Sequence, residues 1–494
     1  MIESQRLSFI RFNQKRLRAE LYNGLQDAFL RGDRDGSSCG KRIILPSSFT
    51  GGPRYMILNY QDVMSICNWA GYLDLFLTFT CNPMWPEVSR FVKEKSPHPS
   101  DCPHILSRIF NIKLGELMKD LHEGCFFGKS RVVVRTVEFQ KRGLPHMHIL
   151  LFLSHEDKFV TPTDINKIVT AKIPNKGTFP KHHEAVANFM IHGPCGDANR
   201  RSPCMRNGKC SKYYPKKFVE HTTTDDDGYV VYKRRNSGCT VVKNGFALDN
   251  HFVVPYNPVI LLKYKAHLNI EICNQSSIIY LLKYISKGHD RVTAALYDNN
   301  NRATNNNVDE IKMYYEYRYI SPCEASWRIF SYDIHFRYPP VDRLQFHLPR
   351  QNSVTYADCD NIEDILNSST ISNTMFTYWF EANLLYPEGR TLTYAEFPTR
   401  FVYLYREKKW YLRKQGFSIG ILYYVPPSSG ELYYLRILLT KVRGETSYDS
   451  IRTVNNITHS TFRQICSAMG LLADDNEFIQ ALKDVSQWGM GHSL

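Results

Sequence analysis

A strand–turn–strand pattern at residues 131 to 152 restricts the fold of this chain more than any other feature. The run Arg131-Val-Val-Val-Arg-Thr-Val-Glu-Phe-Gln140 predicts one strand, and a tight turn leads to an apolar run from Ile149 to Leu153. His146 and His148 are two residues apart on the second strand. Residues two apart in a strand point to the same side of a sheet. Two imidazoles therefore project together from a strand that is otherwise buried.

The strand before the turn carries a third candidate ligand for a metal ion. Glu138 and Gln140 both lie on it, so either side chain can face the two imidazoles across the hairpin. Two nitrogens and one oxygen form a three-ligand site with open positions, which suits Mg²⁺ or Mn²⁺ acting as a Lewis acid on a phosphate. A His-x-His pair alone is also typical of histidines that are simply satisfied in a core.

A helix predicted over residues 276 to 287, ended by Gly288, carries two tyrosines and two lysines. Tyr280 and Tyr284 are four residues apart and share a helical face, with Lys283 and Lys287 as a second such pair. A tyrosine hydroxyl can attack phosphorus when a metal polarises the phosphate and a cation offsets the developing charge. The alternative is an amphipathic helix whose tyrosines lie at the rim of a core.

Length and charge indicate the number of domains and the kind of partner. A chain of 494 residues exceeds one compact core, so we expect two or three domains. The net charge of +14 favours a polyanionic partner, with nucleic acid ahead of an anionic membrane surface. The 31 Tyr and 28 Phe offer flat faces on which unpaired bases can stack.

The sequence shows no recognisable signal peptide or membrane span, so we expect an intracellular protein. Residues 1 to 20 are charged and amphipathic, unlike a signal peptide, and no apolar run approaches the roughly 20 residues of a membrane span. We therefore expect no membrane association. In that setting the 13 cysteines are reduced, and clustered cysteines suggest a metal before a disulfide.

One such cluster lies in a segment, residues 155 to 265, that has little helical periodicity and reads as an insertion. Its members are His192, Cys195, Cys204 and Cys210. They are four plausible zinc ligands, but the spacing matches no common zinc finger, so zinc and free thiols both remain open. The basic residues around the cluster form either a DNA-binding surface or a solvated basic loop. They are Arg200, Arg201, Arg206, Lys209, Lys212, Lys216 and Lys217.

Other elements follow from periodicity and turn signals. Helices are predicted at residues 5–31, about 60–70, 103–122, 459–471 and 475–487, and strands at 74–80 and 268–273. Two hairpins are predicted, one at 218–235 and one that joins 419–425 to 432–439. The Asn-rich stretch 297–307 is the best candidate for an interdomain linker.

Together these residues resemble the HUH superfamily of single-strand endonucleases, and more narrowly the replication-initiator part of Helitron transposases, which carry two tyrosines. Two motifs are central to the resemblance, Glu138-Phe-Gln-Lys-Arg-Gly-Leu-Pro-His-Met-His148 and Tyr280-Leu-Leu-Lys-Tyr-Ile-Ser-Lys-Gly288. The resemblance covers nearly the whole chain. Further similar segments are residues 45–56, 78–83, 319–325, 393–398, 430–436 and 450–455.

The resemblance implies an α+β fold with an HUH-type antiparallel sheet flanked by helices, a Cys/His-containing insertion and a second α+β domain at the C-terminus. The expected domains are an N-terminal helical segment (1–70) that packs on the nuclease, the endonuclease domain (71–296, with the insertion 155–265), a linker (297–307) and a bridge domain (308–494). In the family this bridge precedes a helicase, which we expect to be absent from this chain. The bridge would position DNA or dock a helicase in trans.

The resemblance also implies a rolling-circle reaction on single-stranded DNA at transposon ends, in the nucleus. His146, His148 and Glu138, with Gln140 as the alternative, would bind Mg²⁺ or Mn²⁺, and Tyr280 or Tyr284 would form a 5′-phosphotyrosine link. Lys283 and Lys287 would support these tyrosines, and zinc in the insertion would be structural. The expected DNA contacts are Arg54, Lys141, Arg142, Arg200, Arg201 and Lys209.

Two other functions are weighed against this one. The first is a catalytically inactive single-stranded DNA-binding remnant of a Helitron protein, which the basic charge and the aromatic content suit equally well. The second is an ATP-driven helicase. An ATPase of this kind needs a phosphate-binding loop with four residues between its two glycines. The one near-match in this chain, Gly124-Cys-Phe-Phe-Gly-Lys-Ser130, has only three. We therefore expect no ATPase or helicase activity.

Overall fold

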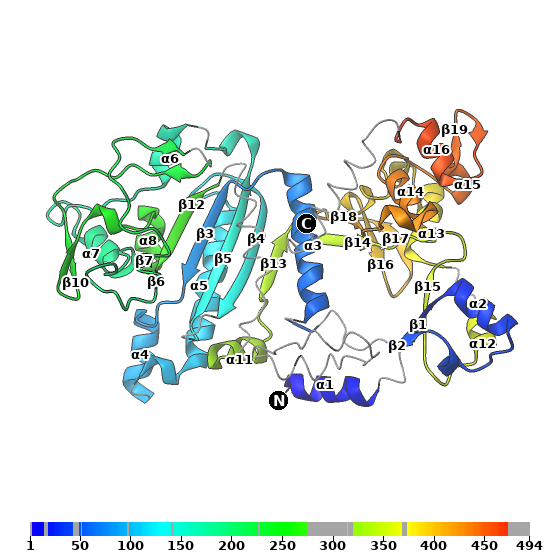
Figure 1. The fold of residues 1–494 in the computed structure, drawn as a ribbon, viewed down its shortest axis with the longest axis horizontal. Helices are drawn as coiled ribbons and strands as arrows, with labels where there is room; N and C mark the ends of the chain where they lie inside the picture. The colour runs from blue at the N-terminus through cyan, green and yellow to red at the C-terminus, as the bar shows by residue number, and fades with distance from the viewer. Residues whose placement is uncertain are drawn as a thin grey trace. The chain divides into compact units, whose positions relative to one another are not determined.

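The structure is a computed structural model of the chain. It describes residues 2–13, 18–42, 49–50, 52–95, 98–139, 143–159, 161–225, 228–273, 314, 320–367 and 373–472. The chain forms two compact units (Figure 1). One, here called the sheet unit, comprises residues 70–292 and 318–338, and the other, the terminal unit, comprises residues 1–69, 293–317 and 339–494.

The sheet unit is built on a five-stranded antiparallel sheet in the order β12–β3–β5–β4–β13 (Figure 1). Its strands are β3 (Leu75–Thr80), β4 (Ser130–Phe139), β5 (Pro145–Leu153), β12 (Leu268–Ile272) and β13 (His335–Tyr338). The strands predicted at 74–80, 131–140 and 268–273 are thus confirmed, as is the hairpin that contains the two histidines. An α+β fold with an antiparallel sheet is confirmed at this level.

The central strand β5 is buried along its whole length. Its side chains alternate between two faces of the sheet, as the strand period requires. Met147, Ile149 and Leu151 belong to the main hydrophobic core, so we call their side the core face. His146 and His148 lie on the opposite side, the site face. A register slip of one residue would exchange these two sets, so the apolar core holds the histidines on the site face.

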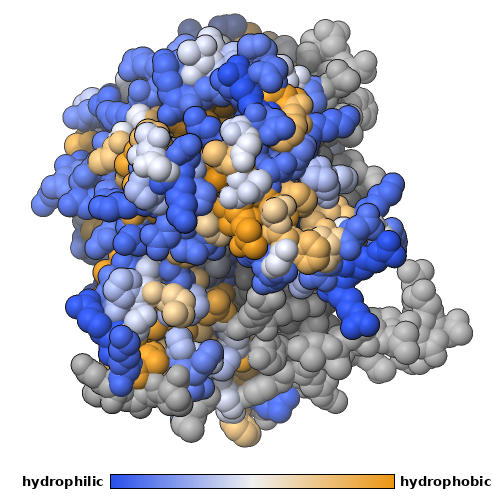
Figure 2. Space-filling model, turned by 90° about the vertical axis from the view of Figure 1, so that its left-hand side faces the viewer, coloured by the Kyte–Doolittle hydropathy of each residue, from blue (hydrophilic) through white to orange (hydrophobic). Residues whose placement is uncertain are grey.

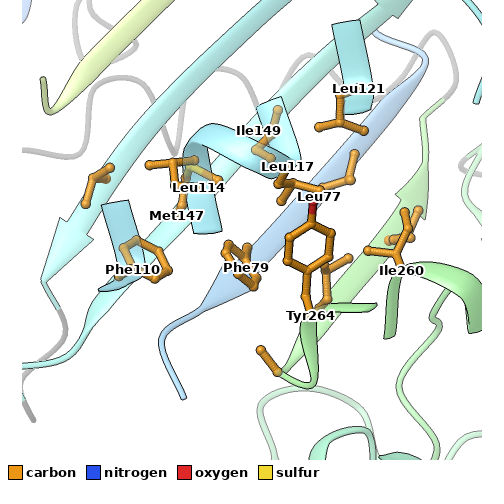
Figure 3. Close-up of a cluster of buried hydrophobic side chains, with 14 of the residues drawn as sticks. Leu77, Phe79, Phe110, Leu114, Leu117, Leu121, Met147, Ile149, Ile260 and Tyr264 are labelled. Carbon is orange, nitrogen blue, oxygen red and sulfur yellow. The ribbon is translucent and has the colours of Figure 1, made fainter. Parts of the chain in front are cut away.

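Helix α5 (Pro103–His122) covers the core face (Figure 3). Its buried leucines and Phe110 recur every three or four residues, which is the spacing of one face of a helix. Figure 3 shows these side chains against Leu77 and Phe79 of β3, with Tyr264 of α8 (Pro258–Tyr264) beside them. Pro103 at the first helical position and Lys119 and His122 in the last turn suit the ends of the helix.

Other helices of the sheet unit among its described residues are α4 (Pro86–Lys95), α6 (Pro162–Ile168), α7 (Pro180–Phe189) and α11 (Pro322–Ile329). The insertion adds the short strands β6 (Met205–Arg206), β7 (Lys209–Cys210), β8 (Thr223–Thr224), β9 (Val230–Val231), β10 (Val241–Lys243) and β11 (Phe246–Leu248). Although the sequence of the insertion shows little helical periodicity, α6, α7 and α8 lie within it. Two of these helices pack into a core of the insertion's own through Val186, Met190 and Leu261.

The hairpin predicted at 218–235 is confirmed, since β8 pairs with β9 and Val219 pairs with Arg234. Buried Arg234 anchors it by donating from Nη1 to the carbonyl oxygens of Asn250 and Val253 at 2.8 and 2.6 Å. An arginine is almost never fully buried unless it is paired, and here backbone carbonyls satisfy it.

The terminal unit contains the helices α1 (Ile2–Phe12), α2 (Tyr22–Leu30), α3 (Pro53–Ala70), α12 (Ile362–Asn367), α13 (Met375–Leu385), α14 (Glu431–Leu438), α15 (Tyr448–Ile451) and α16 (Phe462–Ala468). Its strands are β1 (Arg18–Leu21), β2 (Lys41–Arg42), β14 (Val341–Leu344), β15 (Ser353–Tyr356), β16 (Phe401–Leu404), β17 (Lys409–Leu412), β18 (Ile419–Leu422), β19 (Thr453–Val454) and β20 (Ile457–Thr458). Among the described residues, the short 3₁₀ helices are η2 (Gly36–Ser38), η3 (Pro99–Asp101), η4 (His155–Asp157), η5 (Asn250–Phe252), η7 (Pro387–Thr391), η8 (Phe397–Thr399) and η9 (Pro427–Ser429).

The hairpin predicted at 419–439 is wrong. Strand β18 pairs in parallel with β14, and the segment expected as its partner forms helix α14 instead. Tyr434, Leu435 and Leu438 are buried at helical spacing and join the core of the terminal unit. A short apolar run fits a strand and a buried helix equally well, so tertiary packing decided between them. The helix near 459–471 is confirmed as α16, and the helix predicted at 475–487 lies outside the described residues.

The N-terminal residues also differ from expectation. A single helix over 5–31 is wrong, because α1 ends at Phe12 and strand β1 precedes α2. Strand β1 pairs with β15 of the terminal unit, and residues 1–69 are part of that unit. Conversely, residues 318–338 follow the predicted linker but return to the sheet unit, where β13 pairs with β4. In the described part of the chain, no helix is both long enough and apolar enough to cross a membrane.

Candidate functional site

His146 and His148 lie next to each other on the site face, as their spacing predicts. Their ring centroids are 4.8 Å apart and the rings are nearly perpendicular, at 78°. Both residues are buried, with 9% and 6% of their surface exposed. The ring of His148 also stacks on Phe76 of β3, with centroids 5.4 Å apart. Two imidazoles are therefore held close together by the sheet itself.

Two threonines of β3 contact the Nδ1 atoms of these rings. Thr80 is paired with His146 and Thr78 with His148 in the strand register. The Thr80 Oγ1 lies 2.7 Å from His146 Nδ1, and the Thr78 Oγ1 lies 3.4 Å from His148 Nδ1. When the Nε2 of a histidine binds a metal, its Nδ1 carries the proton and donates it to an oxygen, which sets the ring's orientation. These threonines are placed to accept those hydrogen bonds.

Glu138 completes the group from the neighbouring strand β4. It is opposite His146 in the register, yet its Oε2 lies 3.3 Å from Nε2 of His148. Its side chain is 23% exposed, more than either histidine. Two ring nitrogens and a carboxylate are thus gathered on one face at the end of the β4–β5 hairpin. Gln140, the alternative oxygen ligand, lies outside the described residues.

The site face also carries a polar atom whose bonding is incomplete. Asn269 of β12 is paired with Thr78, two strands away from His148. Its amide nitrogen donates to Glu271 at 2.7 Å, whereas its Oδ1 is buried and makes no hydrogen bond to any of the residues that the structure describes. A buried acceptor without a donor costs about 1 to 3 kcal/mol. A bound ligand that supplies a donor would remove this cost.

The second cluster predicted from the sequence also comes together in space. His192, Cys195, Cys204 and Cys210 each offer a ligand atom, and these atoms all lie within 4.8 Å of one another. Nε2 of His192 lies 3.4 Å from Sγ of Cys210. Four nitrogen and sulfur ligands in so small a space could hold a metal such as zinc, which prefers tetrahedral sites of this composition.

A tight hairpin shapes this Cys/His cluster. Strands β6 and β7 are joined by Asn207 and Gly208, whose φ angles of 50° and 76° are left-handed. Asn-Gly is the sequence that favours such a two-residue turn, because both central positions need a positive φ. The turn brings Cys204 and Cys210 to the same end of the hairpin, where the N–H of Ser211 donates to the Cys204 carbonyl at 2.8 Å.

The electrostatics of the Cys/His cluster suit metal binding only in part. Burial, then the nearby lysines, lower the pKa of His192 to about 4, so its imidazole is neutral and can act as a ligand. Burial also raises the pKa of the Cys195 thiol to about 12. For Cys210, burial opposes ionisation, but the backbone N–H groups of Tyr214 and Lys212 lower its pKa overall. A bound cation would offset the cost of deprotonating the Cys195 thiol.

The other predicted site residues are distributed as follows. Arg200, Arg201 and Lys209 are exposed and lie in the insertion close to the Cys/His cluster in sequence. Arg54 is exposed on α3, which belongs to the terminal unit. Lys141, Arg142, Tyr280, Lys283, Tyr284 and Lys287 lie outside the described residues. Their roles therefore remain predictions.

Sequence reasoning missed the two threonines, although a signal for them exists. Thr78 and Thr80 are two residues apart, like His146 and His148, within the run Leu-Phe-Leu-Thr-Phe-Thr that ends at Thr80. Two polar side chains on one face of an apolar strand indicate a polar partner on that face. The pairing of β3 with β5 supplies that partner.

Residues 1–151 match the family model described as the Helitron helicase-like domain at the N-terminus. The matched segment includes Glu138, His146 and His148 and ends within β5. The resemblance to Helitron proteins is thereby confirmed for residues 1–151, while its HUH detail and the similar segments beyond residue 151 remain predictions. The match suggests a Helitron-related protein and, at a coarse level, a transposase-like enzyme. No curated protein matches the chain.

Proposed function

We propose that this protein nicks single-stranded DNA and transfers the cut strand through a 5′-phosphotyrosine intermediate, in the manner of rolling-circle transposition. The observation that carries the proposal is the group formed by His146, His148 and Glu138 on the site face. Binding of DNA alone does not require two imidazoles and a carboxylate beside one another. An HUH-type domain arrangement and action in the nucleus, on transposon ends, are parts of the same proposal.

The residues of this group fit a divalent cation. Each Nδ1 is contacted by a threonine hydroxyl, which makes the two Nε2 atoms the natural metal ligands, and Glu138 Oε2 already lies 3.3 Å from one of them. Two nitrogens and one oxygen leave positions open for a phosphate oxygen and water. The chemistry that Mg²⁺ or Mn²⁺ supplies in such a site is Lewis-acid polarisation of the phosphate.

The proposed nucleophiles are Tyr280 and Tyr284, on the evidence of the sequence motif. The phenol oxygen of one tyrosine forms a bond to the scissile phosphorus, and the bond from phosphorus to the 3′-oxygen breaks. The tyrosine proton is balanced by the proton that the leaving 3′-oxygen takes up, so the products are a 5′-phosphotyrosine and a free 3′-OH. Attack of a 3′-OH on that link reverses the step, so rejoining needs no ATP.

We propose zinc at the Cys/His cluster as a structural ion of the insertion. The convergence of four ligand atoms within 4.8 Å supports it, because such a closed four-ligand set leaves no position for substrate. The nicking chemistry and the zinc are independent of each other: the first needs the site face and the second needs only the insertion.

The proposal is tested by incubating the full chain with Mn²⁺ and a broad set of end-labelled single-stranded oligonucleotides. The expected product is a protein–DNA adduct that survives denaturation and that is absent when the divalent cation is omitted. The His146→Ala/His148→Ala double variant and the Tyr280→Phe/Tyr284→Phe double variant should both lose the adduct. Tyr405→Phe, a change at an exposed tyrosine of the terminal unit, is the matched control and should retain it.

Two outcomes would contradict the proposal. If no oligonucleotide gives an adduct while DNA binding persists, the protein is a non-catalytic single-stranded DNA-binding protein. If the Tyr280→Phe/Tyr284→Phe variant forms as much adduct as the wild type, the nucleophile has been assigned to the wrong residues. ATP hydrolysis stimulated by DNA would indicate a helicase and is not expected.

A further inference from the structure

Next to the Cys/His cluster, three residues after Cys210, lies an exposed tyrosine, Tyr213, that the proposed chemistry does not use. Tyr213 is 82% exposed. Its φ of 58° is left-handed, a conformation that L-residues rarely adopt. Its N–H donates to the carbonyl of Cys210 at 2.9 Å, so the turn that shapes the cluster also presents this ring.

The neighbouring tyrosine has the opposite environment. The ring of Tyr214 stacks on the ring of His192, with centroids 4.1 Å apart and planes 16° from parallel. Burial raises the pKa of Tyr214 to about 12, which keeps its hydroxyl neutral. Lys216 Nζ lies 5.4 Å from the centroid of Tyr214 and 5.7 Å from that of Tyr213. One tyrosine thus anchors the turn, and the other presents an aromatic face flanked by a cation.

The surroundings of Tyr213 are strongly basic. Residues 192 to 217 contain seven Lys and Arg residues and a single acidic residue, Asp197, which pairs with Arg200. The exposed cations of this segment are Arg200, Arg201, Arg206, Lys209, Lys212 and Lys217. The side of the molecule on which the insertion lies is mainly hydrophilic, with an apolar area near the middle of the view (Figure 2). A surface of this charge favours a polyanion.

We propose that the hairpin surface around Tyr213 binds single-stranded DNA, with the Tyr213 ring stacking on a base while Arg206, Lys209 and Lys212 contact phosphates. An exposed aromatic ring beside cations suits an unpaired base, because every base offers a flat face to stack on. In duplex DNA both faces of a base are already stacked, so the ring gains little there. The choice of DNA rests on the proposed function, and the surface would hold the strand at a place other than the site face.

The test measures fluorescence anisotropy of a labelled oligothymidine on titration with the zinc-loaded full chain. Tyr213→Ala should weaken binding by about 5- to 150-fold, since stacking on one aromatic side chain contributes about 1 to 3 kcal/mol per base. Tyr213→Phe should bind like the wild type. Lys209→Glu/Lys212→Glu should weaken binding and make it less sensitive to salt, because fewer counterions are released. Tyr405→Ala removes an exposed tyrosine elsewhere and should change nothing.

The result is independent of nicking when the same titrations are repeated in the His146→Ala/His148→Ala variant. An effect of Tyr213→Ala in that variant supports the DNA-binding surface even if no adduct forms with the wild type. Equal affinity of wild type and Tyr213→Ala, with unchanged zinc content and thermal unfolding, would overturn the inference. So would tighter binding to a duplex, or to an RNA of the same length, than to the single-stranded DNA.

Discussion

Glu138 is opposite His146 in the pairing of β4 with β5, yet its carboxylate reaches the other imidazole, with Oε2 3.3 Å from Nε2 of His148. This diagonal contact places the carboxylate beside His148. Both Nδ1 atoms are contacted from the opposite strand β3 by Thr78 and Thr80. Three adjacent strands therefore determine how the site is arranged, with the histidines on the middle one.

Removing the Thr80 hydroxyl should weaken metal-dependent activity without unfolding the sheet. Thr80→Val keeps the shape of the side chain but takes away the oxygen that lies 2.7 Å from His146 Nδ1. Loss of such an outer partner of a metal-binding histidine typically costs about 10- to 100-fold in metal affinity or activity. We expect a loss of that size in adduct formation, measured across a Mn²⁺ titration. Thr80→Ser retains the hydroxyl and should behave like the wild type, and equal activity of Thr80→Val would argue against this role.

Neutralising Glu138 tests whether the carboxylate takes part in binding the cation. Glu138→Gln keeps the size of the side chain and one oxygen but removes the charge. We expect a higher Mn²⁺ concentration for half-maximal adduct formation, because a neutral amide is a weaker ligand for a hard cation than a carboxylate. Binding of single-stranded DNA in the absence of metal should be unchanged. If Glu138→Gln has the same Mn²⁺ dependence as the wild type, a different residue is the third ligand.

Loss of zinc should unfold the insertion locally. The purified chain is expected to contain one bound zinc ion, measured by elemental analysis, and Cys204→Ser/Cys210→Ser should contain none. Without the ion, limited proteolysis should cut near residues 192–217 first, since these segments are short hairpins and turns. Cys239→Ser changes a cysteine of the insertion outside the cluster and should keep the metal. Full zinc content in the double variant would show that the ion binds at another place in the chain.

Asp120 should make folding stability depend on acid pH. Burial opposes its ionisation, but hydrogen bonds from Lys263 Nζ at 2.5 Å and the Tyr264 hydroxyl at 2.6 Å lower its pKa overall. A carboxyl whose pKa is lowered by folding contributes stability above its unfolded pKa of about 3.9, and this contribution is lost as pH falls through the folded pKa. These bonds join α5 to α8.

The measurement for Asp120 is denaturant unfolding of the wild type and of Asp120→Asn. At about pH 7 the variant should be less stable by about 1 to 3 kcal/mol, the usual range for hydrogen bonds to a charged group. The difference should shrink as the pH falls below the unfolded pKa of about 3.9 and through the lowered folded pKa, because the wild-type carboxyl then becomes protonated. Asp101→Asn, at an exposed acid just before α5, should show no such difference. A difference for Asp120→Asn that does not change with pH would mean that the charge is not its cause.

Much of the site was predictable because it depends on short-range periodicity. The shared face of His146 and His148 follows from the two-residue period of a strand, and their closeness to Glu138 follows from the tight turn between the strands. The cluster of His192 and three cysteines was predictable from composition and the reducing environment expected for the chain. In both cases the residues that carry the chemistry lie within about 20 residues of each other in sequence, or are recognisable as metal ligands from their residue type.

The failures have a common cause in long-range packing. The segment 432–439, predicted as a strand, forms helix α14 instead because its buried side chains pack in the core of the terminal unit. Strand β13 was not predicted at all, since four residues of mixed polarity give no periodic signal until β4 provides the pairing edge. Thr78 and Thr80 were missed because their partners His148 and His146 meet them only when β3 pairs with β5.

The sequence by itself thus determined the chemical groups of this protein and their local spacing: two histidines on one face of a strand, a carboxylate across a turn, and four zinc-type ligands in one insertion. Only the tertiary structure decided which groups meet, because pairing of β3, β4 and β5 joins segments from different parts of the chain. That pairing placed the threonines at Nδ1 and Glu138 against His148. The tertiary structure also gave two tyrosines that are adjacent in sequence different environments. Tyr213 is exposed, and Tyr214 stacks on His192.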